Sequence, residues 1–282
     1  MPMLLLLIIM GQTSRWMRPS EISGTTKELT PGIETSKTFK SFAQPCAPVE
    51  INPAHLLSQS EEDRQLLKWF GRLSNGTYLE IGGLDGLTYS NTYVFNKDLG
   101  WKGVLVEIST QNFRYLVRNR PNEIANIHAG VCDQRRQLHY VEGGGPVGGI
   151  WELAPQSFKD KWWPRLTLES PQVQLVECAP LIDLLEPHVG HSFYFDFFSL
   201  DVEGAEFEVL QAIDFSRFGF GIILTEADEH NPLKNLALRK FLERHGYSFL
   251  MDHGRSYWFV NDAFDQIYRD KLLLLPKDTH SG

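Results

Sequence analysis

Short apolar runs alternate with amphipathic stretches along most of the chain. The apolar runs predict strands at residues 78–81, 103–107, 124–129, 197–200, 221–225, 247–251 and 257–260. The amphipathic stretches between them carry apolar residues three and four positions apart, which predicts helices at residues 88–96, 110–119, 205–213 and 233–245. A further helix is expected to begin near Ser60 and to end before Asn75.

This alternation predicts an α/β fold with one mostly parallel sheet, because parallel strands need crossover helices that cover both faces of the sheet. The last two strands differ from the others. They are joined by Asp252-His253-Gly254-Arg255, which predicts a hairpin. The hairpin adds one antiparallel strand to the sheet.

Two segments interrupt the alternation. Residues 11–52 are rich in Ser, Thr, Pro, Gly and Lys, which predicts a linker or disordered arm. Residues 138–180 hold several glycines and three tryptophans, and an insertion of this length is typical of a lid or binding loop. The tryptophans either stack on a sugar or planar acceptor or form the core of the insertion. The predicted organisation is an N-terminal region at 1–55, a domain at 56–265 and a tail at 266–282.

Residues 3–10 form an apolar octet at the N-terminus. The octet is shorter than the roughly 20 apolar residues of a membrane-spanning helix, but it has the length of a signal-peptide core. Neither a basic residue before it nor a small-residue cleavage site after it supports a signal. Membrane or secretory targeting and a truncated or mispredicted chain start therefore stay equally open. The compartment of the protein stays open for the same reason. One N-glycosylation triplet, Asn75-Gly76-Thr77, is present, but such triplets also arise by chance.

Composition excludes several classes of protein. Hydrophobic residues make up 42% of the 282 residues, so the chain is neither a disordered tail nor a fibrous repeat. The net charge is −8 and no basic run occurs, so nucleic acid is not expected as a partner. The three cysteines are widely spaced and predict neither a disulfide framework nor a zinc knuckle.

The strongest chemical signal is the first strand–loop–helix unit, YLEIGGLDGLTYSNT. Glu80 ends the strand, and Gly82 and Gly86 follow it in a loop whose backbone N–H groups can approach a ligand. Such a loop lies at the edge of the sheet where α/β proteins bind ligands. The carboxylate repels a diphosphate but suits a cationic ligand or a ribose diol. The alternative is a glycine-rich turn with a purely structural role.

Two further carboxylates fall at strand ends. Glu107 ends the second strand, where an acidic group can accept hydrogen bonds from both ribose hydroxyls of an adenosine. Asp133 follows the third strand and is placed where a carboxylate can meet an adenine amino group. The alternatives are a solvated strand-end carboxylate for Glu107 and a turn residue for Asp133.

The fourth and fifth strands end in acidic clusters on the same rim. Asp201 and Glu203 follow the fourth strand, and either could hold a ligand's ammonium group, bind a metal or accept a proton from an acceptor hydroxyl. Alternatively, they begin a turn and favour a helix N-terminus. Glu226, Asp228 and His230 follow the fifth strand. The candidate catalytic residues are Asp201, Glu226 and His230, and the candidate metal ligands are Asp201, Glu226 and Asp228.

The ordered run YLEIGGLDG, GVLVE, FFSLDVEGAEFEVL, IILTE and GYSFLMDHGRSYWFV resembles the FkbM family of S-adenosylmethionine-dependent methyltransferases. The resemblance implies a Rossmann-like class I methyltransferase fold, with a seven-stranded, mostly parallel sheet and an antiparallel last strand. It also implies S-adenosylmethionine as cofactor and O-methylation of a sugar-like or small-molecule hydroxyl. The implied cofactor-binding residues are Glu80, Gly82, Gly83, Gly86, Glu107, Asp133 and Asp201. The sequence departs from the commoner Asp-x-Gly-Ala-Asn pattern, and Leu84 replaces a polar side chain.

Two other functions compete with this one. Parts of the sequence also resemble the eukaryotic Star-like subset, which implies an inactive methyltransferase fold in membrane trafficking, tethered by the apolar N-terminus. A nucleotide-dependent oxidoreductase is disfavoured, because the spacing Glu-x-Gly-x-x-x-Gly is not that of dinucleotide-binding loops. The partner expected for the enzyme is a small-molecule or glycan acceptor, and membrane association through the N-terminus is the other expectation. The oligomeric state is left open.

Overall fold

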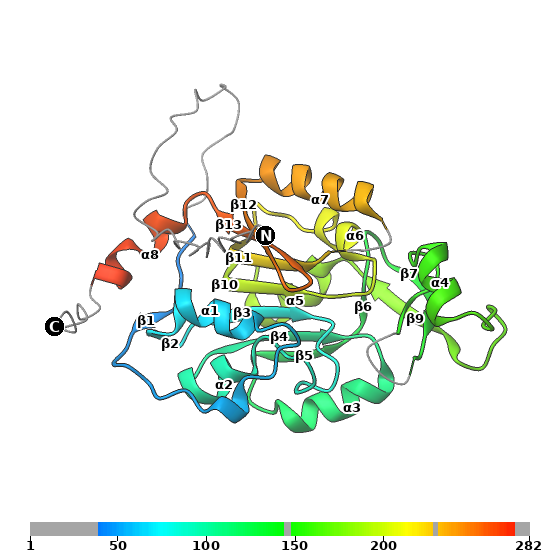
Figure 1. Ribbon diagram of the computed structural model, residues 1–282, viewed down its shortest axis with the longest axis horizontal. Helices are drawn as coiled ribbons and strands as arrows, with labels where there is room; N and C mark the ends of the chain where they lie inside the picture. Colours follow the sequence, from blue (N-terminus) through cyan, green and yellow to red (C-terminus); the bar gives the residue numbers. More distant parts are fainter. Residues whose placement is uncertain (1–38, 144–147, 228–230, 274–282) are drawn as a thin grey trace, which may run out of the picture. The chain divides into compact units, whose positions relative to one another are not determined.

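A seven-stranded sheet forms the centre of the computed structural model, which describes residues 39–143, 148–227 and 231–273 (Figure 1). Its strand order is β12-β13-β11-β10-β3-β4-β5. The bounds of these strands along the chain are β3 (Thr77–Ile81), β4 (Lys102–Glu107), β5 (Ala125–His128), β10 (Phe193–Leu200), β11 (Phe218–Glu226), β12 (Tyr247–His253) and β13 (Ser256–Asn261).

The direction of the strands confirms the predicted sheet. β3, β4, β5, β10 and β11 pair in parallel with one another, whereas β13 is antiparallel to both β11 and β12. The chain builds the sheet outward from β3 through β4 to β5, and then crosses to the other side of β3 to form β10. The carboxyl ends of β3 and β10 are therefore the place where the crossovers diverge, which is where open α/β sheets bind ligands.

Helices cover both faces of this sheet. Successive residues of a buried strand point to opposite sides, so both faces carry apolar side chains that need to be covered. Leu79 packs in one hydrophobic cluster with residues of α5, α6 and α7, and its neighbour Tyr78 packs in another with residues of α1, α2, α3 and α8. The bounds of these helices are α1 (Glu62–Phe70), α2 (Tyr93–Leu99), α3 (Thr110–Asn119), α5 (Leu181–Val189), α6 (Glu206–Gln211), α7 (Pro232–Arg244) and α8 (Phe264–Leu273).

The folded body extends beyond both boundaries expected from the sequence. Residues 39–52 were expected in a linker, but β1 (Gln44–Pro45) pairs with β2 (Leu73–Ser74), and a 3₁₀ turn, η2, spans Pro53–His55. Residues 266–273 were expected in a tail, but they belong to α8. The buried carboxylate of Asp196 explains both differences, because it accepts hydrogen bonds from the hydroxyls of Ser41 and Tyr268, each at 2.5 Å.

The predicted insertion at 138–180 folds together with the residues just before it as a second sheet of four strands, in the order β6-β9-β7-β8. Its strands are β6 (Gly130–Val131), β7 (Arg136–Val141), β8 (Gly149–Ile150) and β9 (Val173–Ala179), and α4 (Gln156–Trp162) lies between the last two. Trp163 is buried against Phe158 and stacks on Trp151, which makes it part of the core of the insertion. Trp162 is 46% exposed.

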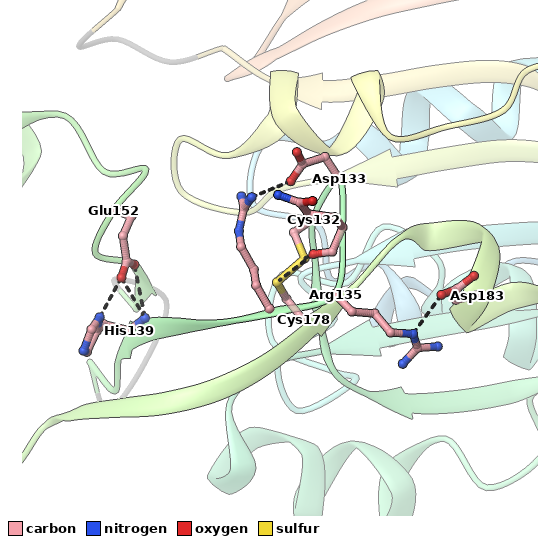
Figure 2. The surroundings of a disulfide bond; sticks show 9 residues. Cys132, Asp133, Arg135, His139, Glu152, Cys178 and Asp183 are labelled. Atoms are coloured by element: carbon pink, nitrogen blue, oxygen red, sulfur yellow. Dashed lines mark hydrogen bonds and ion pairs between the residues drawn. A yellow bond between two sulfur atoms is a disulfide. The ribbon is translucent and has the colours of Figure 1, made fainter.

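A disulfide joins Cys132 to Cys178 and ties the segment after β6 to β9 (Figure 2). The wide spacing of the cysteines did not predict this pairing, because the two residues meet only through the fold of the second sheet. Cys46 is a free cysteine. Among the helices that the structure describes, none is both long and apolar enough for a membrane span. The apolar octet lies outside the described residues.

Candidate active site

A cavity of about 410 Å³ lies beyond the carboxyl ends of β3, β4, β10 and β11. It therefore occupies the edge of the sheet at which the sequence placed its candidate residues. Seven of the candidate carboxylates and glycines line the cavity, namely Glu80, Gly82, Gly83, Glu107, Asp201, Glu203 and Glu226. The second sheet closes another part of the wall with Tyr140, Gly149 and Ile150, and α4 adds Phe158 and Trp162.

Gly82 directly follows β3 and contacts the end of β4 and the residue after β10. Its φ is +87°, and its backbone N–H donates to the carbonyl of Val106 at 3.0 Å. A Cβ atom at this position would lie 1.8 Å from the backbone oxygen of Asp201. Only glycine fits there, because any side chain would push β3 away from the end of β10. The fold itself therefore requires the glycine that the motif assigned to ligand binding.

Gly86 does not line the cavity, but it shapes the loop that does. Its φ is +80°, and a Cβ atom there would lie 2.6 Å from Cγ of Arg120. The buried guanidinium of Arg120 donates to the Gly86 carbonyl and to the Ser90 hydroxyl, both at 3.1 Å. Gly86 therefore shapes the loop by letting this arginine approach the backbone.

Glu80 organises the same loop. Its carboxylate is 4% exposed and accepts hydrogen bonds from the Asn91 N–H at 2.9 Å and the Thr92 hydroxyl at 2.6 Å. Burial raises the pKa of Glu80, and the nearby guanidinium of Arg120 opposes that shift. Because these bonds hold residues 91 and 92 in a turn, α2 begins at Tyr93, although a helix was expected from residue 88.

Glu107 joins the end of β4 to the glycine loop. One of its oxygens accepts the backbone N–H of Leu84 at 2.8 Å, and the other accepts that of Ser109 at 2.6 Å. Burial raises the pKa of Glu107 to about 7. Leu84 supplies this contact through its backbone, with φ at +45°, so the missing polar side chain at position 84 is not needed for it.

Three carboxylates lie close together in the wall of the cavity. Asp201, Glu203 and Glu226 each place one oxygen within 4.8 Å of the others. Burial is the largest cause of the raised pKa of Glu226, and the charges of the neighbouring carboxylates raise this pKa further. The ion pair with Arg255 opposes the shift. The pKa of Asp201 is raised in the same surroundings, although its side chain is open to solvent through the cavity.

The trio includes Asp201 and Glu226, two of the three metal ligands expected from the sequence. Its third member is Glu203, which the sequence also indicated as a residue that could bind a metal. Asp228 and His230 lie outside the described residues, so the structure adds nothing about their roles. Carboxylate oxygens at this separation fit either a cationic group or a hard divalent ion.

Asp133 is not brought to the cavity, which corrects its expected role at an adenine. It lies in an exposed turn after β6 and pairs with Arg136 at 2.7 Å (Figure 2). The turn leads from β6 into β7 of the second sheet, and Asp133 is not among the residues that line the cavity. The cavity wall in this part of the chain is formed by the uncharged residues Gly130 and Val131 instead.

The sequence missed Tyr140 and Arg255 as cavity residues. Tyr140 comes from β7, and burial raises the pKa of its phenol far above the ordinary value. Residues 138–141 were expected in the insertion, as part of a lid or binding loop, and nothing in their sequence indicated a strand of a second sheet. Arg255 lies in the predicted hairpin. The turn of this hairpin could be recognised from the sequence, but the ion pair between Arg255 and Glu226 could not.

The family of the chain is shown by a sequence comparison. The family model described as "Methyltransferase FkbM domain" matches residues 80–249, which is more than half of the chain. The chain belongs to the FkbM methyltransferase family. The match begins at Glu80 and includes Glu107, Asp201 and Glu226. No curated protein matches the chain.

Solved structures similar to this FkbM protein are remote in sequence. An FkbM methyltransferase from Methylobacillus flagellatus KT is 14% identical over 66% of this chain and 43% of that chain, with a TM-score of 0.39. A methyltransferase from Pyrococcus furiosus is 18% identical over 75% of this chain and 87% of that one, with a TM-score of 0.37. A SAM-dependent methyltransferase from Aquifex aeolicus is 13% identical over 74% and 90%, with a TM-score of 0.36. The chain thus spans less than half the length of the Methylobacillus protein.

Proposed function

We propose that this FkbM protein transfers a methyl group from S-adenosylmethionine to a hydroxyl of a sugar-like or small-molecule acceptor. The observation that carries the proposal is the single cavity in which Glu107, the Gly82–Gly83 turn and Asp201 converge. A volume of about 410 Å³ lies within the range of ligand pockets. The family membership supports methyl transfer, and the acceptor and the cofactor contacts are inferences from this cavity.

The residues fit the cofactor part by part. Each oxygen of Glu107 accepts one backbone N–H and keeps a lone pair, so the carboxylate can also accept from the two hydroxyls of a ribose. Gly82 and Gly83 leave the turn open for the chain that links ribose to the amino-acid part. Ile108, Gly130 and Val131 offer an uncharged wall for the adenine ring. The residues present therefore match a nucleoside at one end and a cation at the other.

The acidic trio lies at the cationic end of this arrangement. A sulfonium and an ammonium group both carry positive charge, and Asp201, Glu203 and Glu226 give that part of the cavity a negative potential. When bound, S-adenosylmethionine supplies an electrophilic methyl group. The trio holds the cationic end in place and excludes anionic ligands from it.

Asp201 is the residue we assign to the proton of the acceptor. Its side chain opens into the cavity, whereas Glu226 is buried and paired with Arg255. Burial raises the pKa of Asp201, which makes its carboxylate a better proton acceptor. Asp201 then accepts the proton of the acceptor hydroxyl as the oxygen attacks. His230 and a divalent metal at the trio are the other candidates for this task.

The second sheet and α4 are expected to hold the acceptor. Tyr140, Phe158 and Trp162 line the cavity, and the faces of such rings pack against the apolar faces of sugars. Lys161 lies 4.8 Å from the ring centre of Trp162, which orients this exposed side chain. The acceptor pocket is therefore built by the segment that interrupts the alternating pattern.

Transfer of labelled methyl from S-adenosylmethionine to a panel of sugars and small hydroxyl compounds tests the proposal. We expect transfer to at least one acceptor, lowered about 10²-fold or more in Asp201→Asn, since general-base catalysis contributes that much. Asp133→Asn is the matched control, because this residue lies outside the cavity. Equal rates in the two variants exclude Asp201 as the base. Loss of the activity on removal of divalent ions assigns the trio to a metal, and failure of the protein to bind the cofactor overturns the proposal as a whole.

A further inference from the structure

A buried disulfide indicates where this chain folds. Cys132 and Cys178 are 1% and 2% exposed and share a small hydrophobic cluster with Leu138 and Ile150. Their Cα atoms lie 5.8 Å apart, and the bond joins positions 46 residues apart in sequence (Figure 2). A bond enclosed in this way forms as the core closes. Such a bond is typical of proteins that fold in a compartment in which thiols oxidise, such as the lumen of the secretory pathway.

The glycosylation triplet identified in the sequence has its acceptor side chain on the surface. Asn75 lies in the turn between β2 and β3, with φ at +57°, and its side chain is exposed. Its amide nitrogen contacts the hydroxyl of Ser74 at 3.4 Å, which is at the limit of a hydrogen bond. No other Asn-x-Ser/Thr triplet occurs in the full sequence.

The position of Asn75 keeps a bulky group away from the cavity. Asn75 precedes the first residues of β3, whereas the cavity lies beyond the last residue of that strand. Five residues of extended chain separate the two ends by roughly 16 Å at about 3.3 Å per residue. A glycan on Asn75 would project from the opposite edge of the sheet.

We propose that Asn75 carries an N-linked glycan, added in the same oxidising compartment in which Cys132 and Cys178 pair. The donor is a polyprenyl-diphosphate-linked oligosaccharide. The Asn75 amide nitrogen forms a bond to C1 of the first sugar, the bond from C1 to phosphate breaks, the lipid diphosphate leaves with the electron pair, and the amide nitrogen loses one proton. This proposal is independent of the methyl-transfer function.

The folded structure also fixes when the transfer takes place. The hydroxyl of Thr77 donates to the carbonyl of Tyr194 at 3.0 Å, and Thr77 is 7% exposed. A glycosylating enzyme that reads this hydroxyl must therefore act before β3 pairs with β10. The glycan is added to the nascent chain and afterwards stays at the exposed turn.

The three residues of the triplet also have structural roles, so the test must separate these from modification. A Cβ atom at Gly76 would lie 2.6 Å from the ring of Trp101, and Thr77 binds Tyr194 and Asp196. Asn75→Asp keeps a residue type that tolerates the left-handed turn but removes the amide nitrogen. Thr77→Ser keeps both the hydroxyl and the triplet and serves as the matched control.

The experiment is expression of the full chain in cultured eukaryotic cells, followed by digestion with peptide-N-glycosidase. We expect the digestion to increase gel mobility of the wild type and of Thr77→Ser, and to leave Asn75→Asp unchanged. Alkylation of the denatured, unreduced protein should label Cys46 alone. A wild type with unchanged mobility overturns the glycan whether or not the disulfide is formed, and labelling of all three cysteines overturns the assigned compartment.

Discussion

The carboxylate of Glu107 and the backbone N–H of Leu84 lie 2.8 Å apart, and this hydrogen bond couples the end of β4 to the glycine loop after β3. The same carboxylate lines the cavity. A single buried side chain thus both fixes the shape of the loop and offers acceptor lone pairs to a ligand. Protonation of Glu107 would weaken both functions together.

Cofactor affinity is expected to depend on pH through Glu107. Burial raises its pKa to about 7, so the carboxyl is protonated in most free molecules at pH 6 and ionised in most at pH 8. Because the ionised form accepts ribose hydroxyls, affinity for S-adenosylhomocysteine should rise by up to about tenfold between these pH values. Calorimetric titration at pH 6, 7 and 8 measures this. Glu107→Gln should bind more weakly, with a flatter pH profile; an equally steep profile in that variant would assign the dependence to another group.

Gly82→Ala should lower the free energy of unfolding more than replacement of another glycine that also has a positive φ. The new Cβ atom would lie 1.8 Å from the Asp201 carbonyl, whereas a Cβ atom at Gly190, with φ at +77°, would meet nothing within 4 Å. Gly190→Ala should cost about 1–3 kcal/mol of unfolding free energy, from backbone strain alone. Gly82→Ala should exceed this by at least about 1 kcal/mol, because the clash adds to the strain. Urea unfolding of both variants gives the comparison, and equal losses would show that β3 and β10 can separate without cost.

Reduction of the disulfide should destabilise the second sheet. Closure of a 46-residue loop restricts the unfolded chain, and the chain-entropy relation gives about 4 kcal/mol as the largest expected effect. Urea unfolding with and without a reductant measures the difference, and Cys46→Ser should show the same difference as the wild type. Gly130 and Val131 line the cavity next to Cys132, so reduction should also weaken binding of S-adenosylhomocysteine. Unchanged stability under reduction would show that the bond does not support this sheet.

The main sheet could be predicted because its signals are local. The strand that ends at Glu107 and the helix over residues 110–119 follow from short apolar runs and helical spacing, and the structure has them at Lys102–Glu107 and Thr110–Asn119. The hairpin at residues 252–255 was recognised from its turn residues. The carboxyl ends of parallel strands share one edge, so Glu80, Glu107 and Asp201 could be placed together without knowledge of side-chain contacts.

What could not be predicted depends on contacts between distant residues. Asp133 was misplaced because the turn that holds it leads into the second sheet, and no local pattern states which sheet a strand joins. The early start and late end of the folded body depend on Asp196, which binds Ser41 and Tyr268 from opposite ends of the chain. Helix α2 begins later than expected because Glu80 binds residues 91 and 92. Each of these buried carboxylates fixes a segment whose own sequence does not reveal the partner.

The most direct test of a cofactor site in this cavity is calorimetric titration of the wild type, Glu107→Gln and Asp133→Asn with S-adenosylhomocysteine at pH 8. We predict one saturable site in the wild type, affinity lowered about tenfold or more in Glu107→Gln, and no change in Asp133→Asn, whose carboxylate pairs with Arg136 outside the cavity. No binding at millimolar ligand, or the same affinity in wild type and Glu107→Gln, would contradict the account.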